Sequence, residues 1–424
     1  MKRHLIGIGG VGMSALATAL VRLGDTVTGA DRTLGTPNIA FLESLGVRVF
    51  PDDGSGVDAA TDEVIVSTAI EETNAGLRKA KELGIPVTHR AKALARTLGG
   101  YRLVAVVGTC GKSTVTAMLG HVLAECGLDP MCVNGANVPG WEGAVRFGRG
   151  EYAVAEVDES DKSLVAFRPY AAIVTNASAD HYSKEEMDEV FDAFIKNCEG
   201  PVIDARGETY RPQDFNRQNA SLAVRMAVAL GCDRAAAEKA MESFGGVERR
   251  LQRYGANVYD DYAHNPEKLR AMWLTLAEKH EKGLCVVWRP HGYAPLRKMM
   301  DALAAMFNEV IRPQDTLLLL PVYDAGGTTD RTVSSGELKE RMERCRGPAE
   351  TQRRGDTGGV GGCRRPAETQ RRGDTGGVGG CALVDDLDVA YEWCAAHKDD
   401  FGAFVTCGAR DPGLPKLARR LSMM

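Results

Sequence analysis

The residues best suited to chemistry form a glycine-rich run that ends in a lysine and two hydroxyl residues, Gly108-Thr109-Cys110-Gly111-Lys112-Ser113-Thr114. The run follows an apolar segment at 103–107 and precedes an expected helix at 113–126. In such a loop the lysine ammonium reaches the β- and γ-phosphates of a nucleotide, and the serine hydroxyl binds Mg²⁺. Val106 stands where the full phosphate-loop pattern has its first glycine. The run nevertheless predicts a binding site for ATP or GTP.

Acidic residues and a histidine follow two other apolar segments. Glu156-Val157-Asp158-Glu159-Ser160-Asp161 comes directly after 152–155, and Asp180-His181 follows 172–175. Carboxylates at the carboxyl end of a strand in a phosphate-loop domain suit Mg²⁺ coordination. A solvated acidic turn would explain Asp161, but it explains Glu156 poorly, because Glu156 directly continues an apolar segment. His181 is either a structural residue or part of the same site.

A second glycine-rich run, Gly7-Ile8-Gly9-Gly10-Val11-Gly12, lies between an expected strand at 4–8 and an expected helix at 13–23. Glycines there allow a tight turn and let a phosphate approach the backbone N–H groups of a helix N-terminus. Asp31 ends the next expected strand, where an acid can bind a ribose hydroxyl. This run alone leaves NAD and another nucleotide-containing ligand equally open. A purely structural turn is less favoured, because several glycines cost stability.

Polar runs also follow apolar segments in the last third of the chain. Asp260-Asp261-Tyr262-Ala263-His264-Asn265-Pro266 comes after 257–259, and Arg289-Pro290-His291-Gly292-Tyr293 comes after 284–288. We expect each of these runs to lie at a sheet edge, between the strand that precedes it and a helix that follows it.

Short apolar segments alternate with helical patterns along the chain, which is typical of α/β architecture with parallel sheets. A length of 424 residues suggests two to three domains. Glycine pairs at 99–100 and 245–246 mark breaks in the pattern. We therefore predict domains at 1–99, 100–246 and 247–424.

Composition limits the classes of protein that fit. The net charge of −5 is mild, so phosphate binding must depend on local groups, and no nucleic-acid partner is expected. The 11 cysteines include no Cys-x-x-Cys pair, which indicates reduced thiols rather than a disulfide framework or a zinc site. Glycines interrupt the apolar start, so we expect neither a signal peptide nor membrane insertion. A cytoplasmic protein, monomeric or weakly dimeric, is predicted.

The order of the motifs resembles that of the Mur ligase family over nearly the whole chain. The resemblance is carried by HLIGIGGVGMSALA, GTCGKST, EVDESD, TNASADH, GGVERRL and DDYAHNP. It implies a UDP-substrate-binding Rossmann-like domain, a central phosphate-loop ATPase domain and a C-terminal Rossmann-like domain. It also implies an ATP-dependent ligase of peptidoglycan precursor synthesis, which joins L-alanine to the carboxylate of UDP-N-acetylmuramate through an acyl phosphate. A related ligase with another amino acid, peptide or nucleotide sugar is the alternative.

The resemblance further implies roles for single residues. ATP would contact Gly108, Thr109, Gly111, Lys112, Ser113, Thr114, Asn219, Asp261 and His264. Mg²⁺ would be bound by Ser113, Glu156 and His181. Arg250 would lie near the γ-phosphate and act in catalysis with Lys112, Glu156 and His181. The UDP-sugar would contact Gly9, Gly10, Val11, Gly12, Asp31 and His291, and the NAD interpretation is then dropped.

Several positions depart from the family pattern. Cys110 replaces a usual histidine, and Leu222 replaces a second asparagine. Gly292 and Pro295 replace two arginines that contact substrate in alanine-adding members. The departures leave the ATPase interpretation intact and bear on the identity of the amino acid and the sugar. A non-enzymatic or oxidoreductase function would leave the phosphate loop and the acidic run unused.

Residues 345–380 form a tandem duplication in which 363–380 repeats 345–362 with a single difference, Gly347 against Arg365. The segment is rich in glycine and arginine and almost free of large apolar residues, so it cannot build a core. Two copies are too few for a solenoid. We predict a disordered surface insertion between a helix at 334–344 and a strand at 382–384, and we favour a passive insertion over a functional basic arm, because acidic residues offset much of the arginine charge.

Overall fold

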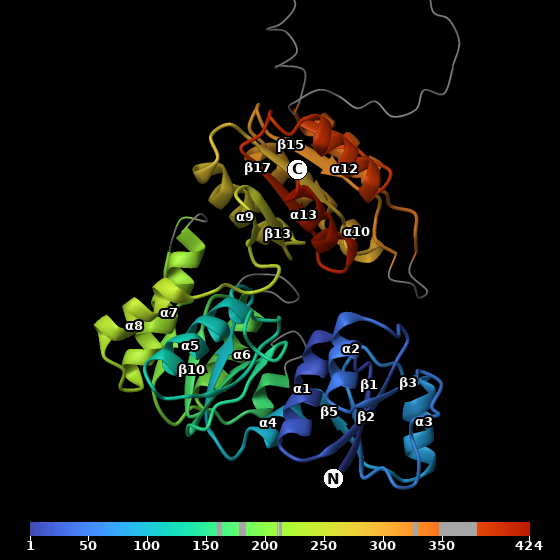
Figure 1. Cartoon of the computed structure of the whole chain (residues 1–424), viewed down its shortest axis with the longest axis vertical. Helices are drawn as coiled ribbons and strands as arrows, with labels where there is room; N and C mark the ends of the chain where they lie inside the picture. The colour runs from blue at the N-terminus through green and yellow to red at the C-terminus, as the bar shows by residue number, and fades with distance from the viewer. Residues whose placement is uncertain (159–162, 178–183, 210, 212–213, 325–329, 347–379) are drawn as a thin grey trace, which may run out of the picture. The chain divides into compact units, whose positions relative to one another are not determined.

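The computed structural model describes residues 1–158, 163–177, 184–209, 211, 214–324, 330–346 and 380–424 (Figure 1). Within these ranges the chain forms three sheets built mainly from parallel strands, with helices between most consecutive strands. This arrangement confirms the predicted α/β fold.

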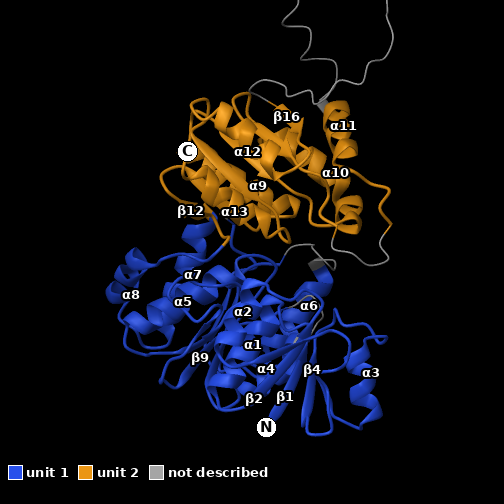
Figure 2. Ribbon diagram, turned by 45° about the vertical axis from the view of Figure 1, so that its right-hand side comes forward, with its two compact units in different colours: residues 1–210, 215–248 blue, residues 211–214, 249–424 orange. Residues whose placement is uncertain are grey.

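Backbone contacts divide the chain into two compact units (Figure 2). Residues 1–210 and 215–248 form the first unit, which contains two of the sheets. Residues 211–214 and 249–424 form the second unit, which contains the third sheet. The predicted start of the last domain lies close to the boundary between residues 248 and 249. The predicted division of the first unit near residue 99 stays a prediction.

The first sheet has the strand order β3-β2-β1-β4-β5, and all of its pairs are parallel. Its strands are β1 (Lys2–Ile6), β2 (Thr26–Asp31), β3 (Arg48–Pro51), β4 (Glu63–Val66) and β5 (Val87–His89). Its helices are α1 (Val11–Arg22), α2 (Pro37–Ser44), α3 (Ala75–Glu82) and α4 (Arg90–Thr97). The order reverses beside β1, and ligands of open α/β sheets bind at the carboxyl ends of strands at such a point. The first glycine-rich run follows β1 there.

The second sheet has the order β11-β10-β6-β9-β7-β8, with β8 antiparallel. Its strands are β6 (Arg102–Val107), β7 (Met131–Val133), β8 (Val145–Arg146), β9 (Tyr152–Glu156), β10 (Ala171–Val174) and β11 (Val202–Asp204). Its helices are α5 (Lys112–Glu125), α6 (Lys184–Ile195), α7 (Phe215–Ala229) and α8 (Arg234–Ala240), with 3₁₀ turns η1 (Ser163–Ala166) and η3 (Met241–Ser243). Residues 103–107 of β6 are fully or nearly fully buried, as expected for a strand covered on both faces.

The third sheet has the order β12-β13-β17-β14-β15-β16, with β12 antiparallel. Its strands are β12 (Gln252–Tyr254), β13 (Val258–Asp261), β14 (Leu284–Trp288), β15 (Thr316–Leu319), β16 (Gly380–Leu383) and β17 (Ala403–Cys407). Its helices are α9 (Pro266–Lys279), α10 (Tyr293–Val310), α11 (Ser335–Arg346), α12 (Leu387–Ala396) and α13 (Gly413–Leu421). None of the described helices is both long enough and apolar enough to cross a membrane.

One apolar core joins the two sheets of the first unit. Buried residues of α1 and α4 belong to the same cluster as strand residues of both sheets, including Leu5 of β1 and Ala105 of β6. Helix α4 also contacts η1. Helix α1 contacts β7 and β8 of the second sheet as well as β2 of the first, so the two helices pack against elements of both sheets.

Some predicted boundaries were shifted. Strand β1 ends at Ile6 and helix α1 begins at Val11, so Gly12 lies in the first turn of the helix and not in the preceding loop. Helix α11 continues to Arg346 and strand β16 begins at Gly380, so both ends of the duplicated segment belong to regular elements. Residues 347–379 of the predicted insertion lie outside the described residues.

Candidate active site

The phosphate loop leads from β6 into helix α5, whose start has no side-chain cap. The N-cap residue Gly111 has φ +84° and no side chain caps the helix. Gly108 also has a positive φ, of +128°, which favours glycine at both positions. A helix start without a side-chain cap suits an anion, which the helix dipole also favours.

The shape of the loop is fixed by the residues that follow the neighbouring strand β10. Oδ1 of Asn176 accepts hydrogen bonds from the Thr109 hydroxyl at 2.6 Å and from the Cys110 N–H at 2.9 Å. The Thr175 hydroxyl donates to the Cys110 carbonyl at 2.6 Å. Because the backbone of Cys110 makes these bonds, cysteine in place of histidine leaves the loop's geometry intact.

Lys112 and Ser113 occupy the first turn of α5. Nζ of Lys112 donates to the carbonyl of Gly108 at 2.7 Å, so the ammonium lies over the loop that it belongs to. Ser113 is buried and Thr114 is half-buried. This placement agrees with a lysine that serves phosphates bound in the loop.

Glu156 ends β9, the strand on the other side of β6. Its carboxylate accepts the Gly135 N–H at 2.8 Å. A Cβ on Gly135 would lie 2.3 Å from the same carboxylate, so a side chain there would displace the carboxylate from this position. In the order β10-β6-β9, all three parallel strands end at the same edge of the sheet. That edge therefore carries Ser113, Glu156 and the segment after β10.

The described part of the predicted Mg²⁺ site fits a hard cation. Ser113 and Glu156 offer a hydroxyl and a carboxylate oxygen, the donor type that Mg²⁺ prefers. His181, the third predicted ligand, lies outside the described residues. Among the residues that the structure describes, no cluster of three His, Cys, Asp or Glu side chains forms a metal site.

Asn219 lies on α7 against the phosphate loop. It is 1% exposed, and a Cβ on Gly111 would come within 2.7 Å of its Oδ1. Its Nδ2 has no hydrogen-bond partner in the described part of the chain, which leaves a buried donor for a ligand at the loop. Leu222 lies one turn further along α7, fully buried in the apolar core beneath, so this departure from the family pattern is a packing residue.

The turn after β1 is organised by Asp31. One carboxylate oxygen accepts the Gly9 N–H at 2.9 Å, and the other accepts the Thr33 N–H at 2.9 Å. The Gly10 N–H donates to the Gly7 carbonyl. Gly10 caps helix α1 without a side-chain hydrogen bond. The next N–H groups, those of Val11 and Gly12, have no acceptor among the described residues. They are therefore the donors that an anion could use.

Predicted residues of the second unit gather around Tyr262. The guanidinium of Arg250 lies 5.1 Å from the centre of the Tyr262 ring, and the ring of His264 meets Tyr262 edge-on at 5.5 Å. The rings of His264 and His291 are 4.7 Å apart. The structure therefore brings Arg250, His264 and His291 together. Tyr262, at their centre, received no role from the sequence.

Asp261 shapes the same loop. Its two oxygens accept the N–H groups of Leu251 and Ala263, each at 2.7 Å. Burial raises the pKa of Asp261 above its ordinary value, with the charge of Arg250 acting in the opposite direction. The carboxylate is already occupied by backbone donors, so its direct contribution in the protein is to fix the chain around Arg250.

Arg250 stands between two residues with left-handed backbone conformations, Arg249 at φ +58° and Leu251 at φ +48°. Such conformations are costly outside glycine and persist where surrounding contacts enforce them. Here Arg249 pairs with the fully buried Asp260 at 2.9 Å and donates to the carbonyls of Gly408 and Ala409. Apart from two adjacent arginines, nothing in the sequence indicates this anchor.

The described residues of the first turn of α10, at 293–296, include no cation that could take the place of the two missing family arginines. Gly292 is the N-cap of α10, and Pro295 lies in its first turn. Arg297, the next arginine along the chain, pairs with Asp330 at 2.8 Å. Arg289, which precedes the run, pairs with Asp411 at 2.5 Å. Both arginines are thus bound within the protein.

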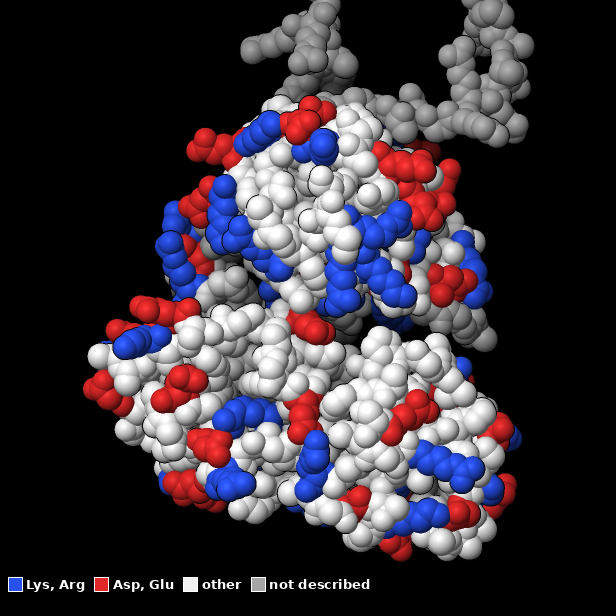
Figure 3. Space-filling view, in the orientation of Figure 1, with Lys and Arg blue, Asp and Glu red and all other residues white. Residues whose placement is uncertain are grey.

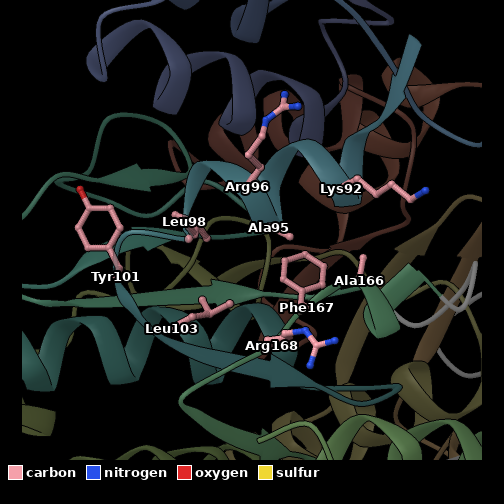
Figure 4. A pocket seen from close by; sticks show the side chains of 10 residues that line it. Lys92, Ala95, Arg96, Leu98, Tyr101, Leu103, Ala166, Phe167 and Arg168 are labelled. Carbon is pink, nitrogen blue, oxygen red and sulfur yellow. The ribbon is translucent and has the colours of Figure 1, made fainter. Parts of the chain in front are cut away.

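A cavity of about 420 Å³ lies elsewhere in the first unit, between α4, η1 and the beginning of β6. Figure 4 shows Phe167, Leu98 and Leu103 as its apolar walls, with Lys92 and Arg168 at the rim. It lies at the opposite end of β6 from the phosphate loop, and it contains none of the predicted site residues. Charges of both signs are interspersed over the face of the first unit seen in Figure 3, so phosphate binding depends on local groups.

Comparison with known proteins points to one family. A family model described as "Mur ligase family, catalytic domain" matches residues 2–102. The UDP-N-acetylmuramate–L-alanine ligase of Cyanothece sp. is 32% identical over 413 residues, covering 80% of this chain and 84% of that protein. The ligase of the same name from Arthrobacter sp. is 33% identical, covering 80% and 85%.

Solved structures share the fold. A UDP-N-acetylmuramate–alanine ligase from Thermotoga maritima has a TM-score of 0.76 at 23% identity, covering 100% of this chain and 98% of that one. A murein peptide ligase from Psychrobacter arcticus has a TM-score of 0.62 at 18% identity, with the same coverage. These two likenesses concern the fold alone.

Proposed function

Because the chain belongs to the Mur ligase family, we propose that it is an ATP-dependent ligase that joins L-alanine to the carboxylate of UDP-N-acetylmuramate in peptidoglycan precursor synthesis. Relatives with this activity in their names match most of the chain at about one-third identity. The observation that carries the proposal is the pair of uncapped helix starts in one unit, at Gly10 and Gly111. One suits the diphosphate of a nucleotide sugar and the other suits the phosphates of ATP.

A carboxylate is a poor electrophile, so amide formation needs a leaving group. In the proposed reaction a carboxylate oxygen attacks the γ-phosphorus of ATP, and ADP leaves. The amine nitrogen of the amino acid then attacks the acyl carbon, phosphate leaves, and the amine gives up a proton. Lys112 neutralises charge that builds up on the transferring phosphoryl group.

The residues at the shared sheet edge would hold the metal. Ser113 and Glu156 would bind Mg²⁺ through oxygen, together with His181. The bound ion supplies charge neutralisation for the phosphates. Glu156 keeps its orientation through the Gly135 N–H.

The remaining predicted residues lie in the second unit. We propose that Arg250 acts on the γ-phosphate and that His264 and His291 contact nucleotide and substrate, as the family pattern implies. Tyr262 positions the Arg250 guanidinium, and Asp261 holds the backbone that follows it by accepting the Leu251 N–H. Asp31 acts on the UDP-sugar in a similar indirect way, because its oxygens hold the glycine turn.

A ligase that adds a peptide in place of L-alanine is the second candidate. The observation that favours it is the start of α10, where Gly292 and Pro295 replace two arginines and the described residues supply no substitute cation. A site without these arginines would recognise its second substrate by other contacts.

The test is phosphate release from ATP with UDP-N-acetylmuramate and each of the twenty amino acids, followed by a cell-wall peptide that begins with L-alanine. We expect release with L-alanine alone among the amino acids. Release only with the peptide would establish the second candidate. Release that does not depend on UDP-N-acetylmuramate, or no release with any pair, would reject both.

A further inference from the structure

Arg90 is the first residue of helix α4, and its guanidinium packs on the first turn of helix α1. A Cβ built on Gly12 would lie 3.0 Å from Nη1 of Arg90 and 3.4 Å from its Cζ. The glycine at position 12 therefore makes room for this side chain. The N–H groups of Val11 and Gly12, which lack an acceptor among the described residues, begin the same turn.

The position of Arg90 is electrostatically unfavourable for the protein alone. A cation near the N-terminus of a helix opposes the helix dipole, at a cost of roughly 0.3–1 kcal/mol. Arg90 stands at two such ends, that of α4 along the chain and that of α1 in space. A guanidinium at this place suggests that an anion completes the arrangement, since sites of this kind are usually functional.

Arg90 also has unused hydrogen-bonding capacity. Its side chain is 20% exposed, and it makes no hydrogen bond within the described part of the chain. Its ion-pair partner there is Asp158, with 3.6 Å between Nη2 and Oδ2. That separation exceeds hydrogen-bond length, and Asp158 is 42% exposed, so the pair is loose.

Asp158 connects this arginine to the second sheet of the unit. It lies two residues after Glu156, at the end of β9, in the acidic run that carries the proposed metal ligand. Arg90 therefore touches the glycine turn of the first sheet and the acidic run of the second. A guanidinium has five donors in a planar fork, which suits the paired oxygens of a phosphate group.

We propose that Arg90 binds the diphosphate of the nucleotide sugar and that the diphosphate replaces Asp158 as the partner of the guanidinium when the substrate binds. The inference rests on the proposed function, because the glycine turn is the diphosphate site of that function. The backbone donors of Val11 and Gly12 take one side of the diphosphate and Arg90 supplies the charge. In the free protein, Asp158 competes with the diphosphate for the same guanidinium.

Calorimetric binding of UDP-N-acetylmuramate without ATP tests the proposal. Arg90→Met keeps the length of the side chain and removes its charge, and we expect Kd to rise by about tenfold or more. Arg90→Lys keeps the charge without the fork and should fall between Arg90→Met and the wild type. Lys92→Met is the matched control: Lys92 is exposed on the same helix, outside the glycine turn, and Kd should stay within about twofold.

The Asp158→Asn substitution should not raise the Kd for UDP-N-acetylmuramate as Arg90→Met does. Removing the competing carboxylate should leave the Kd for UDP-N-acetylmuramate unchanged or lower it by up to about fivefold. A residue with a merely structural role would not produce tighter binding in this variant. The Kd for ATP, measured without the sugar, should stay within about twofold in the Arg90 variants.

The outcomes separate the inference from the proposed function. Wild-type protein that binds and uses UDP-N-acetylmuramate, with Arg90→Met binding equally well, overturns the inference and leaves the function standing. Asp158→Asn binding more weakly by over about threefold overturns the exchange between Asp158 and diphosphate. Wild-type protein that does not bind the nucleotide sugar rejects the function and the inference together. If Arg90→Met does not fold, Arg90→Lys and Asp158→Asn still decide.

Discussion

The two glycine turns of the first unit follow one plan and obtain their positive charge differently. Each comes after a parallel strand and begins a helix whose glycine N-cap has no side-chain hydrogen bond. In the phosphate loop the cation is Lys112, the first residue of the helix itself. In the turn after β1 the nearby cation is Arg90, which comes from a different helix.

The groups that hold the two turns in shape also differ. The phosphate loop is held by a neutral amide, Asn176, which accepts from Thr109 and Cys110. The turn after β1 is held by a carboxyl group, Asp31, which accepts from Gly9. A carboxylate beside a diphosphate is unfavourable unless a cation compensates for it. The turn that uses an aspartate thus has the greater need for a separate cation.

This difference shows why one turn could be interpreted from a short motif and the other could not. Gly-Lys-Ser contains the backbone geometry and the charge of its site in consecutive residues. Gly-x-Gly-Gly-x-Gly contains only the geometry, so it is compatible with NAD, with UDP and with other nucleotides. The identity of its ligand depends on residues that the fold supplies from elsewhere.

Replacing Lys112 by alanine tests the turn that carries its own cation, and it should have the largest effect. Transition-state charge on the phosphoryl group loses its main side-chain partner, so kcat should fall about 10³-fold or more. Steady-state ADP release measures the loss, with Lys92→Ala as a charge-matched control. A folded Lys112→Ala protein with more than about a tenth of wild-type turnover would refute the phosphate-loop assignment.

Replacing Glu156 by glutamine tests the sheet edge beside that turn. Glutamine keeps an oxygen that can accept the Gly135 N–H and removes the charge, so the loop should hold while Mg²⁺ binding weakens. We expect turnover to fall about 10²-fold and the Mg²⁺ requirement to rise. His181→Ala should act in the same direction but less severely.

Initial rates against Mg²⁺ concentration separate these two residues. A wild-type curve for His181→Ala would exclude His181 as a ligand. A wild-type curve for Glu156→Gln as well would place the metal elsewhere.

Much of the fold could be predicted because its strands are short buried runs separated by helical periods. Residues 103–107 of β6 are an example, since a strand covered on both faces is apolar throughout. The phosphate loop was predictable for the same local reason. The end of β1 was not, because the apolar character of the chain continues into Ile8 after the strand has ended at Ile6.

Other parts of the candidate site depend on contacts between distant residues. The two oxygens of Asp31, which was predicted to bind a ribose, accept the backbone N–H groups of Gly9 and Thr33 from two different turns. Arg90 has no motif around it, and its partners come from other elements. Arg249 and Leu251 adopt left-handed conformations that no residue preference favours. Such features become visible only when the fold has brought their partners together.

The strands beneath the two turns offer a third comparison, in acid stability. Strand β1 contains His4, which is 1% exposed, whereas the buried part of β6 has no titratable side chain. Burial lowers the pKa of His4 from 6.5 to about 4. Since the folded-state pKa lies below the unfolded one, the stabilising contribution is present above pH 6.5 and is lost as the pH falls from 6.5 to 4.

His4→Gln should flatten this dependence, because glutamine does not titrate and can still reach the Thr28 hydroxyl, which lies 2.9 Å from Nδ1 of His4. Between pH 7 and pH 5 the wild type should lose about 2 kcal/mol more unfolding free energy than the variant. Urea unfolding at the two pH values measures the difference. Equal losses in both proteins would show that His4 is not the acid-sensitive group of the first sheet.

Removal of the duplicated segment should have the smallest effect on kcat and on stability. It therefore provides a reference for the losses of activity expected from substitutions at the two turns. Cys345 and Arg346 belong to α11 and Gly380 begins β16, so excision of 345–380 as a whole would shorten both elements. A short Gly/Ser linker in place of 347–379 spares them. Excision of 363–380 alone is a gentler variant, because Gly362 then precedes Cys381 just as Gly380 does in the full chain.

Both excisions should leave kcat within about twofold, since the segment has no residues able to build a core. Loop-closure entropy grows slowly with length, and halving the loop by removing one copy should stabilise the chain by only about 0.6 kcal/mol. Thermal unfolding and ADP release measure the two quantities. If the linker variant folds but loses ligation while the one-copy variant keeps it, a single copy of the repeat has a function; if both lose it, the duplication itself is required, and the interpretation as a passive insertion is wrong.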